Sequence, residues 1–353
     1  MMNIKTVKLG FSNIKNKIFE RLYIKSNIDF TKPVQIYGMI NKRCNACCIM
    51  CNSWRSEKFE ELPAKDWIEG LRSLKSFVGS FHINFSGGEP FLKKDFFDIL
   101  DFCRKEKISS GITTNGLLLK DLNLERILGL DLLNINISLD SMDPLIHDKL
   151  RGVPGMLEKV KENINILVKR KHALNKDVKI VLKPIVCNMN LSGLDDIVRY
   201  AAQMSLTGVN FQPIFRWSKE SASMFRVNMQ DLEVAIEKLI KLKKEGYPIL
   251  NSENAIKRWI HYFKGEINSR DSICHVAVRN LNINPDGEMT LCGFCDSSIG
   301  NFKNENIKSA WYSQSTKDLR KSLVHCKRLC TATCVVKRNW SDYAQLFLSL
   351  TKK

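Results

Sequence analysis

Cysteines are the residues in this chain whose number and spacing point most directly to chemistry. The chain has 353 residues and 12 cysteines, most of them in two groups. The first group is Cys44, Cys47, Cys48 and Cys51, and the second is Cys274, Cys292, Cys295, Cys326, Cys330 and Cys334. In a large chain without a recognisable secretion signal, this grouping favours metal ligation over disulfides, because cytosolic thiols stay reduced.

The first group allows three kinds of site. Cys44, Cys48 and Cys51 have the spacing CxxxCxxC, and three thiolates from one loop would leave one iron of a cubane cluster open to a cofactor or substrate. The group also contains two CxxC pairs, Cys44/Cys47 and Cys48/Cys51, which zinc could use, although structural zinc sites usually draw their pairs from separate segments. A redox dithiol is the third alternative.

Charge and hydropathy narrow the class of protein. The net charge is +18, from 55 Lys and Arg against 37 Asp and Glu, which raises the question of nucleic-acid binding. No aromatic-interleaved basic stripe accompanies the charge, so nucleic acid is not the expected partner. No apolar stretch approaches the roughly 18 residues of a membrane helix, and we expect a cytoplasmic protein. Peripheral membrane contact through the basic amphipathic start of the chain is a weaker alternative.

Strand-like and helical patterns alternate along most of the chain. The six expected strands are 34–39, 81–85, 109–113, 133–138, 178–186 and 208–212. The expected helices are 64–74, 94–105, 122–128, 156–169, 194–203 and 231–244. Six strand–helix units predict a parallel sheet in an α/β fold, most simply a partial (β/α)6 TIM-like barrel. A doubly wound open sheet is the alternative, but no GxGxxG motif is present.

Four regions are expected along the chain: an N-terminal amphipathic helical segment (1–33), a barrel (34–250), a small cysteine-rich domain (251–340) and a tail (341–353). In the third region, Pro285-Asp286-Gly287 separates two short apolar runs and predicts a β-hairpin, since Asp-Gly supplies the positive φ that such turns need. Metal ligands are expected to contribute to the stability of this region.

Two motifs together resemble the radical SAM superfamily. The string Cys44-Asn-Ala-Cys-Cys48-Ile-Met-Cys51, after the first strand, looks like its cluster-binding signature, and Gly87-Gly88-Glu89-Pro90, after the second strand, looks like its companion motif. The resemblance implies a [4Fe–4S] cluster held by the three cysteines, with S-adenosylmethionine on the open iron. It also implies cleavage of that cofactor to a 5′-deoxyadenosyl radical, which abstracts hydrogen from a substrate.

The resemblance also assigns roles to residues near the cofactor. The positions that match are Met50 near the adenine, Gly87, Gly88 and Glu89 near the methionine amino group, and the polar strand-end residues Asn115, Ser138 and Asp140. Ser138 is the better candidate for a ribose contact. The segment from His147 to Gly152 resembles one found in SPASM-bearing members, where Arg151 could reach a carboxylate. Cys187, at the end of the fifth strand, could donate a hydrogen atom, as a cysteine does in epimerising members.

The second cysteine group resembles a SPASM or twitch domain. Cys274-x12-Gly-x4-Cys292 looks like the opening of these domains, and Cys326-x3-Cys330-x3-Cys334 continues the likeness in a shortened tail. Six cysteines would complete one auxiliary [4Fe–4S] cluster, with Cys274 and Cys292 as ligands and two more from Cys295, Cys326, Cys330 and Cys334. Zinc is the alternative for this region.

The expected reaction is hydrogen abstraction followed by oxidation, epimerisation or cross-linking of a peptide or small molecule. A flavodoxin- or ferredoxin-type reductant is the expected electron source. Two rivals from other classes are a zinc-stabilised nucleic-acid-binding protein and an iron–sulfur electron-transfer protein. The first would explain the charge and cysteines but not Gly87–Pro90 on a barrel pattern, and the second would not cleave S-adenosylmethionine.

Overall fold

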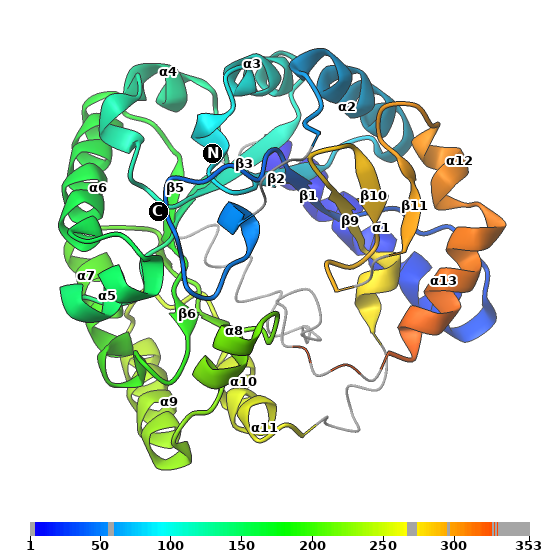
Figure 1. Ribbon diagram of the computed structural model, residues 1–353. Coiled ribbons are helices and arrows are strands. Elements are labelled where there is room, and N and C mark those ends of the chain that lie inside the picture. Colours follow the sequence, from blue (N-terminus) through cyan, green and yellow to red (C-terminus); the bar gives the residue numbers. More distant parts are fainter. Residues whose placement is uncertain are drawn as a thin grey trace.

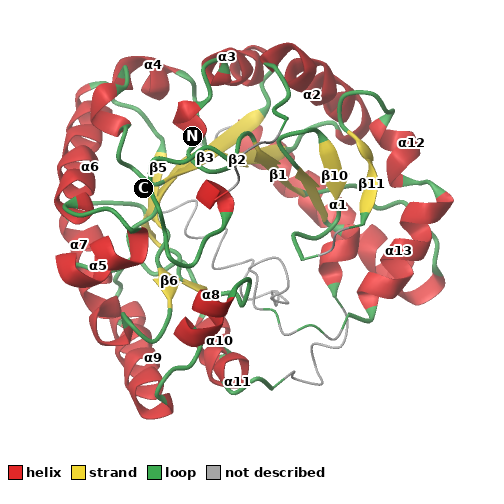
Figure 2. Ribbon diagram, viewed as in Figure 1, coloured by secondary structure: helices red, strands yellow, loops and turns green. Residues whose placement is uncertain are grey.

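A curved parallel sheet surrounded by helices forms most of the molecule (Figure 1). The structure is a computed structural model that describes residues 4–55, 60–266, 274–294, 297–326, 328 and 330. Figure 2 shows the strands inside an open ring of helices. The predicted α/β class with a partial barrel is confirmed.

Six strands in chain order make the barrel part of the sheet. They are β1 (Gln35–Met39), β2 (His82–Ser86), β3 (Ser109–Thr114), β4 (Asn134–Ile137), β5 (Lys179–Leu182) and β7 (Gly208–Val209). Each pairs in parallel with the next. Their carboxyl ends therefore meet at one rim, where parallel α/β folds place their ligands.

The last two predicted strands are each divided in the structure. The predicted strand 178–186 forms β5 and then β6 (Ile185–Val186), and 208–212 forms β7 and then β8 (Gln212–Pro213). Pro184 lies between β5 and β6, and its missing N–H cannot continue the ladder. The segments β6 and β8 pair with each other as a separate two-stranded sheet.

Helices connect the strands and cover the outside of the sheet. Their bounds are α2 (Ala64–Val78), α3 (Phe96–Lys105), α4 (Leu124–Gly129), α5 (Pro144–Arg151), α6 (Met156–Ala173), α7 (Leu194–Gln203), α8 (Lys219–Met224), α9 (Met229–Lys244), α10 (Glu253–Lys257) and α11 (Trp259–Phe263). The outer face of the sheet carries the apolar side chains. Phe85, for example, packs its ring edge against Trp67 of α2, 6.0 Å between centroids.

The inner face of the sheet is polar. Asn84, Thr113 and Asn136, on β2 to β4, form a hydrogen-bonded cluster in which Asn84 Nδ2 donates to Thr113 Oγ1 (2.9 Å) and Asn136 Nδ2 donates to both other side chains. These residues alternate along the strands with the buried Ile83, Phe85, Ile112 and Ile135. Because successive side chains of a strand point to opposite faces, the pattern gives the sheet an apolar outside and a hydrogen-bonding inside.

The cysteine-rich region continues the barrel sheet. The predicted hairpin is confirmed as β9 (Asn280–Ile283) and β10 (Glu288–Thr290), followed by β11 (Ser298–Asn301). The middle strand β10 is antiparallel to both β9 and β11, whereas β9 pairs in parallel with β1. Helices α12 (Ile307–Trp311) and α13 (Gln314–Val324) follow. The boundaries expected at 34, 250 and 340 stay predictions.

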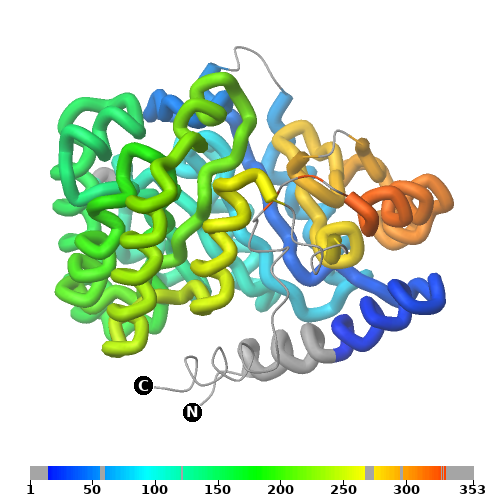
Figure 3. Tube along the Cα trace, turned by 90° about the horizontal axis from the view of Figure 1, so that it is seen from below, coloured from blue at the N-terminus to red at the C-terminus, as the bar shows by residue number. Residues whose placement is uncertain are grey.

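The expected N-terminal helix is present as α1 (Ile4–Ser26), and it packs on the cysteine-rich region (Figure 3). Tyr23 shares a small apolar cluster with Ala277, Val278 and Val324. Glu20 forms an ion pair with Arg279, 2.7 Å from Oε2 to Nη2. Within the described ranges, no helix has both the length and the apolar character needed to cross a membrane.

The packing of α2 on the hairpin region predicts an unusual effect of a glycine substitution. A Cβ at Gly70 would lie 2.3 Å from the ring of Phe302, which is 1% exposed and packed on Trp67. We expect Gly70→Ala to lower the free energy of unfolding by about 1–3 kcal/mol through overpacking, although alanine favours helices. Urea denaturation measures the change.

A matched control comes from α4. A Cβ at Gly129 meets nothing within 4 Å, so Gly129→Ala is expected to be neutral or stabilising by up to about 1 kcal/mol. A Gly70→Ala variant as stable as this control would show that α2 does not pack closely on Phe302.

Candidate active site

The first cysteine group lies in an irregular loop directly after β1, at the rim of the barrel. The structure places Cys48 in the interior, with 7% of its surface exposed, while Cys44 is half-buried and Cys51 is exposed. Burial raises the pKa of the Cys44 thiol to about 11, and burial likewise raises the pKa of Cys48. Positive charge near these thiols is therefore needed to favour the thiolate forms that bind metal.

Backbone contacts from the end of β2 hold the start of this loop. Gly88 N donates to Asn41 O (2.9 Å) and Glu89 N donates to Arg43 O (2.7 Å). A Cβ at Gly88 would lie 2.1 Å from Arg43 O, closer than any real Cβ contact. Glycine is thus required at this position because two backbone segments approach closely. This packing explains the glycine without reference to any cofactor.

The end of α5 holds the middle of the loop. Ile49 N donates to Leu150 O (3.1 Å), and Gly152, with φ +67°, lies so close that a Cβ there would be 2.3 Å from Cys47 O. On the other side, Trp54 Nε1 donates to Cys48 O (3.1 Å). The cysteine loop is therefore positioned by its backbone, and its side chains are left for other partners.

Two polar side chains direct N–H groups at the cysteine sulfurs. Asn115 Nδ2 lies 3.8 Å from Cys44 Sγ, and Arg151 Nη1 lies 3.8 Å from Cys48 Sγ. Asp140 is fully buried and pairs with Arg151 at 2.6 Å. Burial alone would lower the pKa of Arg151, but Asp140 and Cys48 raise it above its ordinary value. Arg151 thus supplies a fixed positive charge beside Cys48. The sequence suggests that Arg151 could reach a carboxylate, and within the chain it contacts that of Asp140.

The Glu89 carboxylate is used inside the protein. It is completely buried and accepts hydrogen bonds from Thr114 Oγ1 and Asn115 N, both at 2.8 Å, which tie the end of β2 to the end of β3. Burial raises the pKa of Glu89 to about 7 despite these donors. The predicted contact of Gly87, Gly88 and Glu89 with a methionine amino group is not tested by this geometry.

The remaining predicted cofactor residues lie at the same rim. Met50 is 5% exposed in the core beside the cysteines, and Ser138 is half-buried where β4 ends, with its backbone N–H bonded to Thr114 O. Asn115 is positioned by its bond to Asn45 Oδ1 (2.7 Å). Their assignment to adenine and ribose stays a prediction.

Two further residues at the rim were not singled out from the sequence. Asn41 follows β1, donates from Nδ2 to Glu89 O (2.9 Å) and has a buried Oδ1 with no partner among the described residues. Lys183 follows β5 on the inner face, in line with Ser138, and burial lowers its pKa. Both lie within two residues of the carboxyl end of a strand, which is the signal that could have identified them.

Cys187 lies at the end of β6, as expected, but inside the apolar core. It is 0% exposed, its backbone N–H donates to Asn190 Oδ1 (3.0 Å), and burial raises its pKa to about 12. The thiol therefore keeps its hydrogen at neutral pH. Its role as a hydrogen donor stays a prediction.

The second cysteine group is brought together in part. Burial is the main cause of the raised pKa of Cys274. Cys292 and Cys326 lie close enough to raise this pKa further. Cys274 is fixed by its backbone N–H, which donates to Val324 O (2.9 Å). Cys330 is half-buried, whereas Cys295 and Cys334 lie outside the described residues.

The chemistry of the first site fits a thiolate-bound cluster. The described residues contain no preformed group of three His, Cys, Asp or Glu side chains at metal-binding distances. Cys44, Cys48 and Cys51 nevertheless share one loop, and Asn115 and Arg151 point N–H donors at two of the sulfurs. Donors of this kind stabilise negative charge on cluster-bound sulfur. Cys44, Cys47, Cys48 and Cys51 form no disulfide bonds.

The buried ion pair predicts a strong penalty for removing one partner. We expect Arg151→Met to lower the free energy of unfolding by about 3–5 kcal/mol, because it leaves Asp140 buried without its cation. The double variant Arg151→Met/Asp140→Asn should recover part of this loss. Urea denaturation of the two single variants and the double variant gives the coupling energy, and additive losses would contradict the pairing.

His147 predicts a pH dependence of stability. It is fully buried, its Nδ1 accepts from Asp140 N (3.1 Å), and burial lowers its pKa from 6.5 to about 4. Between these two pKa values the imidazole is therefore protonated in the unfolded chain but neutral in the folded chain. This contribution is complete above pH 6.5 and is lost as the pH falls towards 4, by roughly 2 kcal/mol between pH 7 and pH 5.

The variant His147→Asn keeps an acceptor for Asp140 N and removes the titration, so its unfolding midpoint should fall less between pH 7 and pH 5. The control His172→Asn removes an exposed imidazole on α6. A slope that changes equally in both variants would show that His147 is not responsible.

Comparison with known proteins agrees with the geometry of the rim. The family described as "Radical SAM superfamily" matches residues 39–184, and SPASM, described as "Iron-sulfur cluster-binding domain", matches residues 274–335. A protein of Thermococcus kodakarensis named "Probable GTP 3',8-cyclase" is 31% identical over 230 residues, covering 61% of this chain and 69% of that protein.

Two further similarities extend over both regions. "Sporulation killing factor maturation protein SkfB" of Bacillus subtilis is 23% identical over 309 residues, covering 87% of this chain and 71% of that protein. The crystal structure of Streptococcus suis SuiB bound to precursor peptide SuiA has a TM-score of 0.67 at 17% identity, covering 88% of this chain and 72% of that chain, and shows the same fold. The chain belongs to the radical SAM superfamily and is a radical SAM enzyme with a C-terminal SPASM domain.

Proposed function

We propose that this enzyme modifies a peptide. The observation that carries the proposal is the lining of the barrel: Asn84, Thr113, Asn134 and Asn136 present neutral amides and a hydroxyl on the inner face of β2 to β4. Such groups both donate and accept hydrogen bonds, which suits the amides of a peptide backbone. A site for a nucleoside triphosphate would instead be expected to carry several positively charged side chains on this inner face.

The similarity to SkfB supports the same choice. That protein is named for the maturation of a sporulation killing factor, and its match to this chain extends across both the barrel and the SPASM region. SuiB, whose fold this chain shares, was crystallised with a precursor peptide. Lys183, the cation at the inner end of β5, is proposed to contact a carboxylate of the substrate or cofactor.

The cofactors supply the radical, and the chain positions them. When bound, the cluster and S-adenosylmethionine would supply a 5′-deoxyadenosyl radical for hydrogen abstraction from the substrate. We assign Cys44, Cys48 and Cys51 to the cluster. Arg151, held by Asp140, keeps a positive charge beside Cys48, and the buried Met50 contributes an apolar side chain next to the cysteines.

The SPASM domain binds auxiliary iron–sulfur, and we propose one [4Fe–4S] cluster there. Cys274, Cys292 and Cys326 are proposed as three of its ligands, because Cys292 and Cys326 both lie near the Cys274 thiol. A flavodoxin- or ferredoxin-type protein is the proposed electron donor. We further propose a cytoplasmic location, since cluster ligation requires cysteines that stay reduced.

Removing the three proposed ligands tests the central chemistry. After anaerobic purification and reconstitution, the native chain should form 5′-deoxyadenosine from S-adenosylmethionine and dithionite. The Cys44→Ala/Cys48→Ala/Cys51→Ala variant should form none and should lose about four irons, the content of one cubane cluster.

Cys47 gives the matched control, because it is exposed and lies in the same loop. Cys47→Ala should keep both the iron and the nucleoside. Loss of activity in this control, or zinc in place of iron in the native chain, would overturn the assignment of the ligands.

A further inference from the structure

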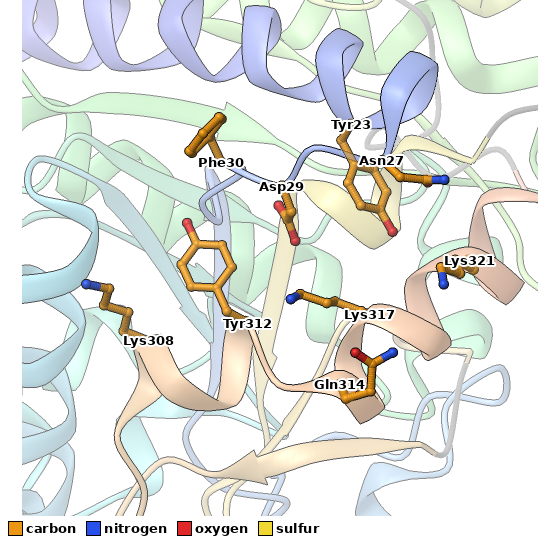
Figure 4. Close-up of a pocket in the computed structure, with 9 residues that line it drawn as sticks. All are labelled: Tyr23, Asn27, Asp29, Phe30, Lys308, Tyr312, Gln314, Lys317 and Lys321. Carbon is orange, nitrogen blue, oxygen red and sulfur yellow. The ribbon is translucent and has the colours of Figure 1, made fainter.

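A second site lies away from the barrel rim, between α1 and the helices of the SPASM region. It is a cavity of about 540 Å³ lined by Tyr23, Asn27, Asp29, Phe30, Lys308, Tyr312, Gln314, Lys317 and Lys321 (Figure 4). None of these residues belongs to the cysteine loop or to the inner face of the sheet. The cavity therefore needs an explanation separate from the radical chemistry.

A rigid network forms the base of the cavity. Arg320 is fully buried, lies over the Trp311 ring at 4.2 Å, and donates to Trp311 O (2.8 Å) and Ala277 O (3.2 Å). It also forms an ion pair with Asp29, which in addition accepts from the side chain and backbone of Thr31. The Asp29 carboxylate is thus neutralised and fully engaged, so it does not cancel the charge of the lysines around it.

The lysines leave the cavity positively charged. Lys317 and Lys321 lie one turn apart on α13, and Lys308 comes from α12. Lys321 has an exposed ion pair with Asp318, 3.6 Å away, whereas Lys308 and Lys317 pair with no acidic group in the described part of the chain. An anion entering the cavity would therefore meet two cations not already engaged and a third that is weakly paired.

A buried hydroxyl without a partner points to the same kind of ligand. Tyr23 is 4% exposed, and its Oη has no hydrogen-bond partner among the described residues. Figure 4 shows the hydroxyl directed into the space near Asp29, Lys317 and Lys321. Burial raises the pKa of Tyr23, so the group stays a donor. An acceptor that enters the cavity would remove the cost of this unsatisfied donor.

The surroundings favour a peptide as the source of the anion. Phe30, which lines the cavity, is 53% exposed, and it offers an apolar contact next to the cations. The chain's own ends are basic: residues 331–353 contain four Lys and Arg and one Asp, and the first ten residues contain Lys5 and Lys8 without an acidic residue. Neither of these two segments therefore supplies an acidic occupant.

We propose that this cavity binds an acidic segment of the peptide substrate, with carboxylates at Lys308, Lys317, Lys321 and the Tyr23 hydroxyl, and an apolar neighbour on Phe30. This inference rests on the proposed function, because it names a docking site for the substrate proposed there. It places recognition of the substrate on a surface separate from the reacting atoms, from which binding energy can still contribute to positioning the substrate.

The test measures binding of a fluorescein-labelled synthetic peptide rich in Glu and Leu to the full reconstituted chain, by fluorescence anisotropy at low salt. The variant Lys317→Glu/Lys321→Glu should bind about tenfold or more weakly through charge repulsion. The control Lys241→Glu/Lys244→Glu makes the same charge change at exposed positions on α9 and should bind as the native chain does. An equal loss in both variants overturns the site.

Two tyrosine variants separate binding from folding. Tyr23→Phe should weaken the peptide about fivefold, the value of one hydrogen bond, without lowering the thermal midpoint. Tyr312→Phe removes a hydroxyl that donates to Thr31 O (2.9 Å) and should instead lower the midpoint with little effect on binding. Equal affinity for a peptide with Gln in place of Glu, or tighter binding of single-stranded RNA, overturns the proposal.

Formation of 5′-deoxyadenosine without peptide is measured on the same samples. The lysine and tyrosine variants should retain it, because none of these residues lies at the barrel rim. A native chain that forms the nucleoside but does not bind the acidic peptide refutes only the docking site. A native chain that binds the peptide but forms no nucleoside refutes the proposed function and leaves the docking site intact.

Discussion

The cysteine loop has no regular secondary structure, so the site depends on how neighbouring backbones hold it. Contacts from Gly88 at the end of β2 and Gly152 at the end of α5 leave no room for a Cβ at either position. Hydrogen bonds from Glu89 N and Ile49 N then fix the two halves of the loop. The loop is thus held by backbone contacts and not by the thiols. Because these contacts fix its conformation, the thiols are already positioned together.

Much of the fold could be predicted from the sequence because its periodicities are local. The first four strands and the hairpin around Asp286-Gly287 follow from alternation and turn chemistry, and the structure places them within one or two residues. The break of the predicted strand 178–186 at Pro184 also has a local signal, but the apolar run around this proline predicts one continuous strand. The parallel pairing of β9 with β1 could not be predicted, because it depends on contacts between distant segments.

The site was predictable to the same extent. Spacing and order identified the cysteines and the Gly-Gly-Glu segment, since these residues are contiguous. The partners that tune them come from distant parts of the chain: Arg151 reaches Cys48 from 103 residues away, and Asn115 reaches Cys44 from 71. The use of Glu89 to join β2 to β3 and the position of Lys183 beside Ser138 likewise depend on the folded geometry.

The attachment of α1 to the end of the chain has a consequence for biosynthesis. Glu20 pairs with Arg279, Asp29 with Arg320, and Thr31 O accepts from Trp311 Nε1, across separations of 259, 291 and 280 residues. The first helix therefore leaves the ribosome long before its binding surface is made, whereas β1 to β4 can pair as they emerge. The contacts that hold the first cysteine loop all come from residues 41–152, so the chain contains every one of them before the later cysteines are translated.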